Sequence, residues 1–193
     1  MGANNNWETV LADGVRLFID HLREKDKLGP PLGNEHFNET PNRVVRSLKE
    51  FTLGVGKSAA SVLGEGFAGD YNEMVVVRGI DYVSLCAHHL LPFVGEVHFG
   101  YLPNGRIVGL SKIPRMVEVL AARPQVQEAL TQNIVEQFQG LVEPMGCGVV
   151  VTGMHTCTTC RGVRKAGVVM KTQGLRGEFL EPEVKSEFLE AIR

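Results

Sequence analysis

Two short segments concentrate the residue types that bind soft metal ions or carry protons. Cys86-Ala87-His88-His89 is the first, and His155-Thr156-Cys157, followed by Cys160, is the second. Thiolates together with imidazoles form the donor set that zinc prefers in proteins. The segments offer more candidates than a tetrahedral site needs, so some are expected to act as acids or bases. The sequence predicts a zinc site and leaves open whether it is structural or catalytic.

The spacing within each segment limits which side chains can meet. Alternation along a strand puts His155 and Cys157 on one face, and Cys86 and His88 on one face if that strand continues far enough. A turn before Leu90 would instead bring His89 around to Cys86. A single histidine or cysteine in a strand is more often a core residue than a ligand. Ordinary core, strand or surface positions are therefore expected for Cys147, His21, His36 and His98.

A cationic group lies where a helix is expected to begin, at Ser111-Lys112-Ile113-Pro114-Arg115. The free N–H groups and positive dipole end of a helix start suit a phosphate. Arg161 and Arg43 could add further charge, although a solvated helix start is the simpler reading. Early in the next helix, Gln125-Val126-Gln127-Glu128 places a carboxylate in the first turn. Glu128 could accept two N–H groups from a guanine-like edge, or the helix dipole could simply stabilise its charge.

The elements that must position these residues follow from hydrophobic periodicity. Helices are expected from Val10 to about Lys27, from Thr40 to Phe51, and over 113–122, 124–141 and 183–192. Strands are expected over 74–77, 80–85, 96–102, 106–110, 148–151 and 167–172. Strands and helices are segregated, which indicates an α+β fold with an antiparallel sheet. The predicted boundary divides an N-terminal helical extension, 1–69, from a sheet domain, 70–193.

Composition excludes several classes of function. The chain of 193 residues has 20 Lys+Arg against 22 Asp+Glu, so it has no basic excess for holding nucleic acid. It has no apolar run of the roughly 18 residues that a membrane helix needs. The start lacks a signal-peptide core and an Arg-rich transit pattern, and a disulfide framework is disfavoured. A soluble, cytoplasmic protein that binds neither nucleic acid nor membrane is expected.

Several motifs taken together resemble the GTP cyclohydrolase I family. They occur in that family's order, and the similarity runs from about residue 39 to the C-terminus. The motifs are Glu39-Thr40-Pro41-Asn42-Arg43, Cys86-Ala87-His88-His89, Gly109-Leu110-Ser111-Lys112, Arg123-Pro124-Gln125-Val126-Gln127-Glu128, and His155-Thr156-Cys157 with Arg161-Gly162. The resemblance implies the tunnelling fold, an antiparallel sheet backed by two helices. It also implies a homodecamer of two pentamers with active sites at subunit interfaces.

The resemblance further implies a reaction and a role for each matching residue. Zinc held by Cys86, His89 and Cys157 would activate water for attack at C8 of GTP. Formate would leave, and the sugar would rearrange to give 7,8-dihydroneopterin triphosphate. The family's motifs imply proton transfer by His88 and His155 and a part in the rearrangement for Ser111. They imply that Glu128 and Gln127 bind the guanine edge. The triphosphate would be bound by Arg43, Lys112, Arg115 and Arg161.

The sequence departs from the family pattern at three places. Ala87 stands where the family usually has Glu, and Val168 to Gln173 replaces most of a Ser/Thr-rich strand. Cys160 is not required by the motif and is interpreted as a bystander. The first two departures motivate an alternative, a diverged paralogue that acts on another purine nucleotide or stops at a ring-opened intermediate. A non-catalytic zinc or nucleotide-binding protein is the other alternative, against which the presence of both His88 and His155 argues.

Overall fold

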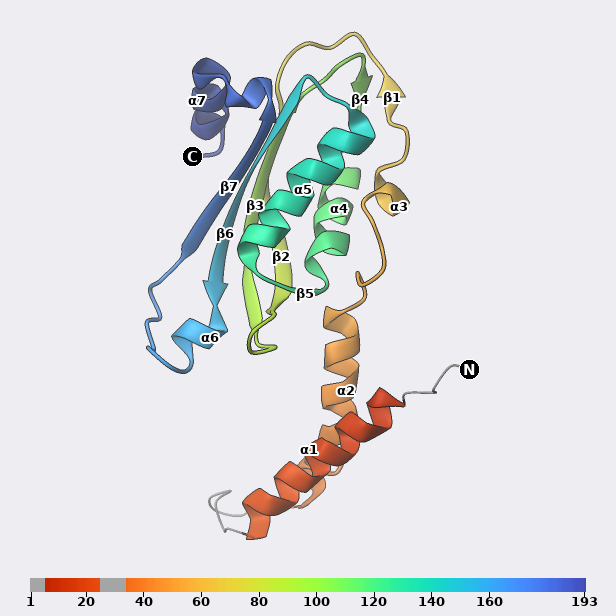
Figure 1. Cartoon of the computed structure of the whole chain (residues 1–193), viewed down its shortest axis with the longest axis vertical. Helices are drawn as coiled ribbons and strands as arrows, with labels where there is room; N and C mark the ends of the chain where they lie inside the picture. The colour runs from red at the N-terminus through yellow and green to blue at the C-terminus, as the bar shows by residue number, and fades with distance from the viewer. Residues whose placement is uncertain (1–5, 25–33) are drawn as a thin grey trace. The chain divides into compact units, whose positions relative to one another are not determined.

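The computed structural model describes residues 6–24 and 34–193 of the chain (Figure 1). The chain divides into two compact units, of which the first ends at Glu50 and the second runs from Phe51 to Arg193. None of the helices in these described ranges combines the length and the apolarity that crossing a bilayer requires.

The first unit contains two amphipathic helices, each of which buries only part of its apolar surface. They are α1 (Trp7–Glu24) and α2 (Thr40–Phe51), with a 3₁₀ turn, η1 (Asn34–His36), before α2. Ile19 of α1 and Val45 of α2 are buried. An ion pair of 2.9 Å joins Lys49 Nζ to Glu8 Oε1. Both helices were expected, and α2 begins at Thr40 as predicted; the predicted end of the first helix at Lys27 lies outside the described residues.

The second unit is built on a five-stranded sheet with the strand order β5-β2-β3-β6-β7. Every pairing is antiparallel except that of β5 with β2. The strands are β2 (Val75–Cys86), β3 (Pro92–Leu102), β5 (Pro124–Gln125), β6 (Gly146–His155) and β7 (Met170–Gly177). Helices α4 (Lys112–Ala121) and α5 (Gln127–Val142) cover one face of the sheet (Figure 1). The expected α+β class, an antiparallel sheet backed by two helices, is confirmed.

Alternation along the strands explains which face the helices cover. Val97, Phe99 and Tyr101 are buried on one face of β3, as their spacing predicted. The rings of Phe99 and Phe138 of α5 meet edge to face with centroids 4.7 Å apart. On the opposite face, η2 (Glu178–Leu180) and α7 (Pro182–Ala191) close a smaller core. The sheet is therefore apolar on both faces near its middle strands, which holds β3 and β6 in a single register.

Several predicted element boundaries are wrong. The strands predicted over 74–77 and 80–85 are one strand, β2, and both β3 and β6 are longer than predicted. Arg106–Ile107 forms β4, which pairs with β1 (Phe67–Ala68) rather than returning along β3. Strands β2 and β6 already pair with the two edges of β3, so β4 cannot form hydrogen bonds with β3. Pro124 and Gln125 form the short strand β5 instead of the first turn of α5, and the last strand spans 170–177 rather than 167–172.

Residues 51–69, which the sequence analysis assigns to the N-terminal extension, pack with the second unit. Helix α3 (Ala60–Leu63) contacts α4 and α5. The N–H of Ala59 donates to Gln137 Oε1 of α5 at 2.7 Å. The domain boundary near residue 70 stays a prediction.

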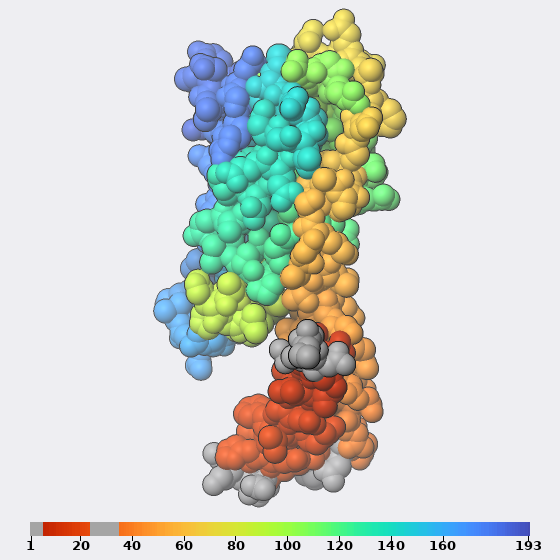
Figure 2. Space-filling view, turned by 45° about the vertical axis from the view of Figure 1, so that its right-hand side comes forward, coloured from red at the N-terminus to blue at the C-terminus, as the bar shows by residue number. Residues whose placement is uncertain are grey.

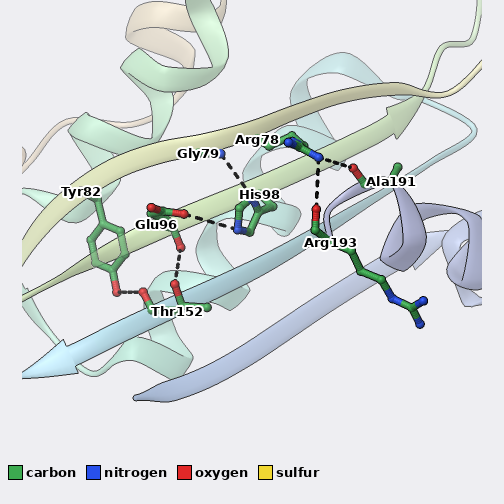
Figure 3. A network of polar contacts seen from close by, with 8 residues as sticks. All are labelled: Arg78, Gly79, Tyr82, Glu96, His98, Thr152, Ala191 and Arg193. Carbon is green, nitrogen blue, oxygen red and sulfur yellow. Dashed lines mark hydrogen bonds and ion pairs between the residues drawn. The ribbon is translucent and has the colours of Figure 1, made fainter. Parts of the chain in front are cut away.

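A polar network on the far side of the sheet ties α7 to β2 (Figure 3). A bulge interrupts β2 at Gly79, whose φ of 67° is left-handed and whose N–H donates to His98 Nδ1 at 3.2 Å. Arg78 Nη1 donates to the backbone oxygens of Ala191 and Arg193 at 3.2 and 3.3 Å. His98, which was expected to be an ordinary strand position, therefore accepts the hydrogen bond from the N–H of Gly79 that the bulge leaves out of the ladder.

The close contact of β3 with β6 at Gly95 gives the first testable prediction. A Cβ at this position would collide with the backbone oxygen of Thr152, which cannot move without shifting the strand. We expect Gly95→Ala to lower the free energy of unfolding by about 1–3 kcal/mol. Urea unfolding at one fixed protein concentration measures this change.

Gly140→Ala is the matched control, because its added methyl group meets nothing within 4 Å. Gly140 lies inside α5, where alanine should stabilise the helix by about 0.5–1 kcal/mol. Equal stability of the Gly95→Ala protein and the wild type would contradict the close strand approach.

Candidate active site

The first ligand segment is a tight turn at the end of β2. The N–H groups of His89 and Leu90 both donate to the carbonyl oxygen of Cys86, at 3.3 and 2.8 Å, and Leu90 has a positive φ of 51°. The turn brings His89 Nδ1 to 3.7 Å from Cys86 Sγ. Strand alternation does not extend to His88, because β2 ends at Cys86. The turn that the sequence analysis left open as an alternative is the geometry observed.

The second ligand segment leaves β6 in the same region. The strand ends at His155, and Cys157 lies in α6 (Thr156–Thr159), a single helical turn. Thr156 Oγ1 donates to the carbonyl oxygen of Pro92, the first residue of β3, at 2.6 Å. The prediction that His155 and Cys157 share one strand face is therefore wrong, since this hydrogen bond ends the ladder and starts the helix.

Long-range register brings the two segments together into one cluster. The ligand atoms of Cys86, His89 and Cys157 all lie within 4.8 Å of one another. Ligand atoms of a tetrahedral zinc site lie roughly 3.5 Å apart, so a small closing movement would fit one ion. Two thiolates and one imidazole suit zinc, and three protein donors would leave a fourth position open. Cys160 is exposed and lies outside the cluster.

Two further predicted residues adjoin the cluster. Arg161 Nη1 lies 3.0 Å from His89 Nε2, and a guanidinium can only donate, so Nε2 accepts. His88 is exposed, with Nδ1 3.9 Å from Cys86 Sγ. Figure 2 shows the turn after β2 and the segment around α6 side by side at the surface of the second unit. The cluster therefore faces solvent on the side where His88 and Arg161 lie.

His155 is held in one orientation by two contacts. Its ring stacks on the buried ring of Phe93 with centroids 4.5 Å apart and planes 6° apart. Its Nε2 lies 3.0 Å from Gln127 Oε1. An amide oxygen only accepts, so Nε2 carries a proton and Nδ1 has the free lone pair in the neutral ring. Burial lowers the pKa of His155, while the nearby Glu128 carboxylate opposes that shift.

Gln127 has a role that the sequence analysis missed. Its side chain is fully buried, and its amide nitrogen donates to the carbonyl oxygens of Val151 and Met170 and to Thr172 Oγ1, at 3.1, 3.3 and 3.1 Å. These bonds aim its oxygen at His155. The geometry favours Gln127 as a positioning residue for His155 over a direct contact with guanine. Glu128, the next residue, is exposed in the first turn of α5.

Gly153 makes the room that Gln127 occupies. It lies two residues before His155 on the same strand, and a Cβ there would overlap Gln127 Oε1 and lie 2.8 Å from Tyr82 Oη. A glycine on the face of a strand that carries a candidate histidine signals such a close approach, so the sequence held this information.

The cationic helix start lies at the other end of the sheet. Ser111 precedes α4, and the C-terminal end of that helix leads into β5, where Gln125 pairs with Cys86. Ten helical residues span about 15 Å. Figure 1 accordingly shows the start of α4 near β4, and the turn after β2 near β5 and α6. One chain therefore does not bring Ser111, Lys112 and Arg115 to the cysteine cluster, and Arg43 belongs to the first unit.

The contact between Gly153 and Gln127 gives a second prediction. In Gly153→Ala, the added methyl group should displace the Gln127 side chain and leave buried polar groups unsatisfied. We expect the free energy of unfolding to fall by about 1–3 kcal/mol. We also expect His155 to lose its preference for a proton on Nε2, which ¹H–¹⁵N spectra of the histidine rings report directly.

Gly167→Ala is the control for this change, because an added Cβ there has nothing within 4 Å. It should leave both stability and the ring spectra unchanged. An unaltered Nε2–H signal in Gly153→Ala would show that Gln127 does not orient His155.

The family model and the curated relatives that match this chain indicate one family. A family model described as GTP cyclohydrolase I matches residues 25–193. The GTP cyclohydrolase 1 of Clostridium perfringens is 40% identical over 173 residues, which cover 90% of each chain. That of Chlorobium phaeovibrioides is 46% identical over 157 residues, covering 80% of this chain and 70% of its own. A solved structure, an archaeosine synthase QueF-Like in the apo form, is 19% identical with a TM-score of 0.47, covering 56% of this chain and 97% of its own. With its matching motifs and its sheet backed by two helices, the chain belongs to the GTP cyclohydrolase I family.

Proposed function

We propose that this protein is a zinc-dependent GTP cyclohydrolase that hydrolyses GTP at C8 and releases formate. The product would be 7,8-dihydroneopterin triphosphate. The observation that carries the proposal is the cluster of Cys86, His89 and Cys157 beside an oriented His155. Membership of the family and the names of its relatives support the same substrate and reaction.

The donor set supports zinc at this position. Soft sulfur donors and an imidazole exclude the hard cations that prefer oxygen ligands, and they come from two segments that the sheet holds in place. When bound, zinc would supply Lewis acidity that makes water nucleophilic near neutral pH.

His155 would deliver and hold protons at the ring nitrogen of guanine. It has a fixed ring plane against Phe93, and Gln127 determines which nitrogen carries its proton. Proton transfer by a positioned side chain commonly contributes 10²–10⁴-fold to a rate, as an order of magnitude. His88, exposed beside the cluster, would move protons at the ribose as the ring opens. His88 is exposed and His155 is half-buried, so both imidazoles could exchange protons with solvent between turnovers.

Glu128 would select guanine. A carboxylate can accept the ring N–H and the amino group of guanine together, and the side chain is exposed next to the residue that holds His155. The reacting ring would then lie between Glu128 and the cluster.

The triphosphate and the sugar would require residues from a second subunit. Arg161 lies at the cluster, but Ser111, Lys112 and Arg115 lie at the far end of α4 in the same chain. This separation supports an assembly in which one subunit's cations serve another subunit's cluster. The proposed assembly is the homodecamer of two pentamers that the family resemblance implies, with Arg43 as a further triphosphate ligand. Ser111 would then handle the sugar rearrangement. A cytoplasmic location stays part of this proposal.

The alternative of a diverged reaction receives little support from the two departures that motivated it. Ala87 is exposed, and its backbone N–H donates to Gln125 O at 3.1 Å, so the substitution leaves the turn intact. Val168 and Val169 are exposed ahead of β7. The Thr172 hydroxyl in the same segment accepts a hydrogen bond from the Gln127 amide. Equal amounts of formate and pterin from GTP would establish the full reaction; formate alone would indicate a stop at a ring-opened intermediate.

Metal content and turnover should separate the ligand role from the acid–base role. We expect Cys157→Ser to weaken zinc binding at least about 100-fold, since even changes around a ligand cost 10–100-fold. We expect His155→Ala to keep zinc and to lose about 10²–10⁴-fold in turnover. Elemental analysis and formate release measure the two effects. Cys160→Ser is the control and should keep both, whereas full zinc occupancy in Cys157→Ser would exclude Cys157 as a ligand.

Substitution of Glu128 tests base selection. Glutamine can accept only one of the two N–H groups, so Glu128→Gln should lower kcat/KM for GTP by about 10–100-fold, as loss of a charged hydrogen bond predicts. Inosine triphosphate lacks the amino group, so its kcat/KM should fall less and the preference for GTP should shrink. Glu136→Gln, on the same helix but paired with Arg176 at 3.3 Å, should keep the preference. An unchanged preference in Glu128→Gln would place the guanine edge elsewhere.

A further inference from the structure

The four cysteines differ sharply in their surroundings. Cys86 and Cys147 are buried, Cys157 is half-buried and Cys160 is exposed. Burial raises the pKa of Cys147 to about 12, and its sulfur lies 3.7 Å from the carbonyl oxygen of Val135, so this thiol is inert. Cys160 is thus the thiol most open to a reagent from solvent, and neither the cluster nor the proposed reaction uses it.

Cys157 and Cys160 lie on one helical turn. The N–H of Cys160 donates to the carbonyl oxygen of Thr156 at 2.9 Å, and Cys160 has helical φ and ψ of −94° and −21°. Residues three apart on a helix share a face, with Cβ atoms roughly 5–6 Å apart. A disulfide needs about 3.5–4.5 Å between them, so a modest tightening of this turn is sufficient.

The chain after Cys160 can accommodate that tightening. Residues 161–169 are all exposed, and Gly162 has a left-handed φ of 61°. None of these residues belongs to either buried core cluster. The N–H of Lys165 donates to the carbonyl oxygen of Thr158 at 3.1 Å, so this exposed stretch would shift together with the turn. The upstream anchor, the hydrogen bond of Thr156 to Pro92, lies outside the turn that would close.

We propose that Cys157 and Cys160 form a reversible disulfide that removes Cys157 from the metal cluster. A low-molecular-weight disulfide, RSSR, would first exchange with exposed Cys160, forming Cys160–S–S–R and releasing RSH. The Cys157 thiolate would then attack the Cys160 sulfur and release the second RSH. The pair loses two electrons and two protons, and RSSR is reduced to two RSH. A dithiol in excess reverses the reaction.

The consequence for the metal rests on the proposed function, because it requires Cys157 to be a ligand. The disulfide would leave only Cys86 and His89 as protein donors, too few for tight zinc binding. Oxidation would therefore release the ion, and a dithiol with added zinc would restore it. The protein would lose activity under oxidising conditions without unfolding its sheet.

Glutathione disulfide is the probe for the test. Zinc content of the full chain is measured first, and the zinc-loaded protein is then incubated with the probe while a chromogenic chelator records released zinc. Peptide mapping without reduction identifies the bonded cysteines. We expect a Cys157–Cys160 linkage, zinc release in step with it, and recovery with dithiothreitol and zinc. Cys160→Ser should release zinc at least about ten-fold more slowly, because the exchanging thiol is absent. Cys147→Ser is the control and should behave as the wild type.

Two results would overturn the proposal. One is zinc release from Cys160→Ser as fast as from the wild type. The other is a map that joins Cys157 to Cys86, since those two sulfurs lie within 4.8 Å of each other. A chain that holds no zinc before oxidation would instead contradict the metal site of the proposed function. In that case the peptide map alone would test whether Cys157 and Cys160 form a disulfide.

Discussion

The antiparallel register of β2, β3 and β6 is the constraint on which the candidate active site depends. Leu85 pairs with Pro92, and Phe93 pairs with His155, so β2 and β6 both end beside the start of β3. The two ligand segments are far apart in sequence, but they leave the sheet at one level. A slip of one residue between β3 and β6 would move His155 to the other face, and a slip between β2 and β3 would move Cys86 away from Cys157.

Local hydrogen bonds convert this register into a site. The carbonyl oxygen of Cys86 accepts two turn N–H groups, and the Thr156 hydroxyl holds the start of α6 against Pro92. Gln127 links α5 to β6 and β7 and orients His155 with its remaining oxygen. A buried amide with all of its partners rigidifies its surroundings, because any displacement leaves several buried polar groups unpaired. The His155 ring is thus anchored to the sheet by its contacts with Gln127 and Phe93.

The same fold separates two kinds of chemistry along its length. The soft donors and His155 lie at one end of the sheet, and the cationic start of α4 lies about one helix length away. Phosphate groups and a nucleobase in one GTP molecule must be bound together, so a second copy is needed to supply the cations in the proposed assembly. Division of the site between subunits would also link assembly to activity, since a single subunit would supply only the proposed metal ligands and proton-transfer residues.

The sequence by itself determined the residue types, the family and most elements of this protein. Cysteine and histidine limit the chemistry whatever the fold, and the periodicity of residues such as Val97, Phe99 and Tyr101 reports a buried strand face directly. Local patterns were less informative at the ends of elements, where β4, β5 and Cys157 departed from expectation. The family resemblance implied that His89 rather than His88 joins Cys86 and that Cys160 stays outside, but residue spacing left both points open. Tertiary structure alone decided that Gln127 serves His155. The physical reason is that side-chain reach at a strand end depends on the turn and on register with distant strands, neither of which is encoded in the spacing of nearby residues.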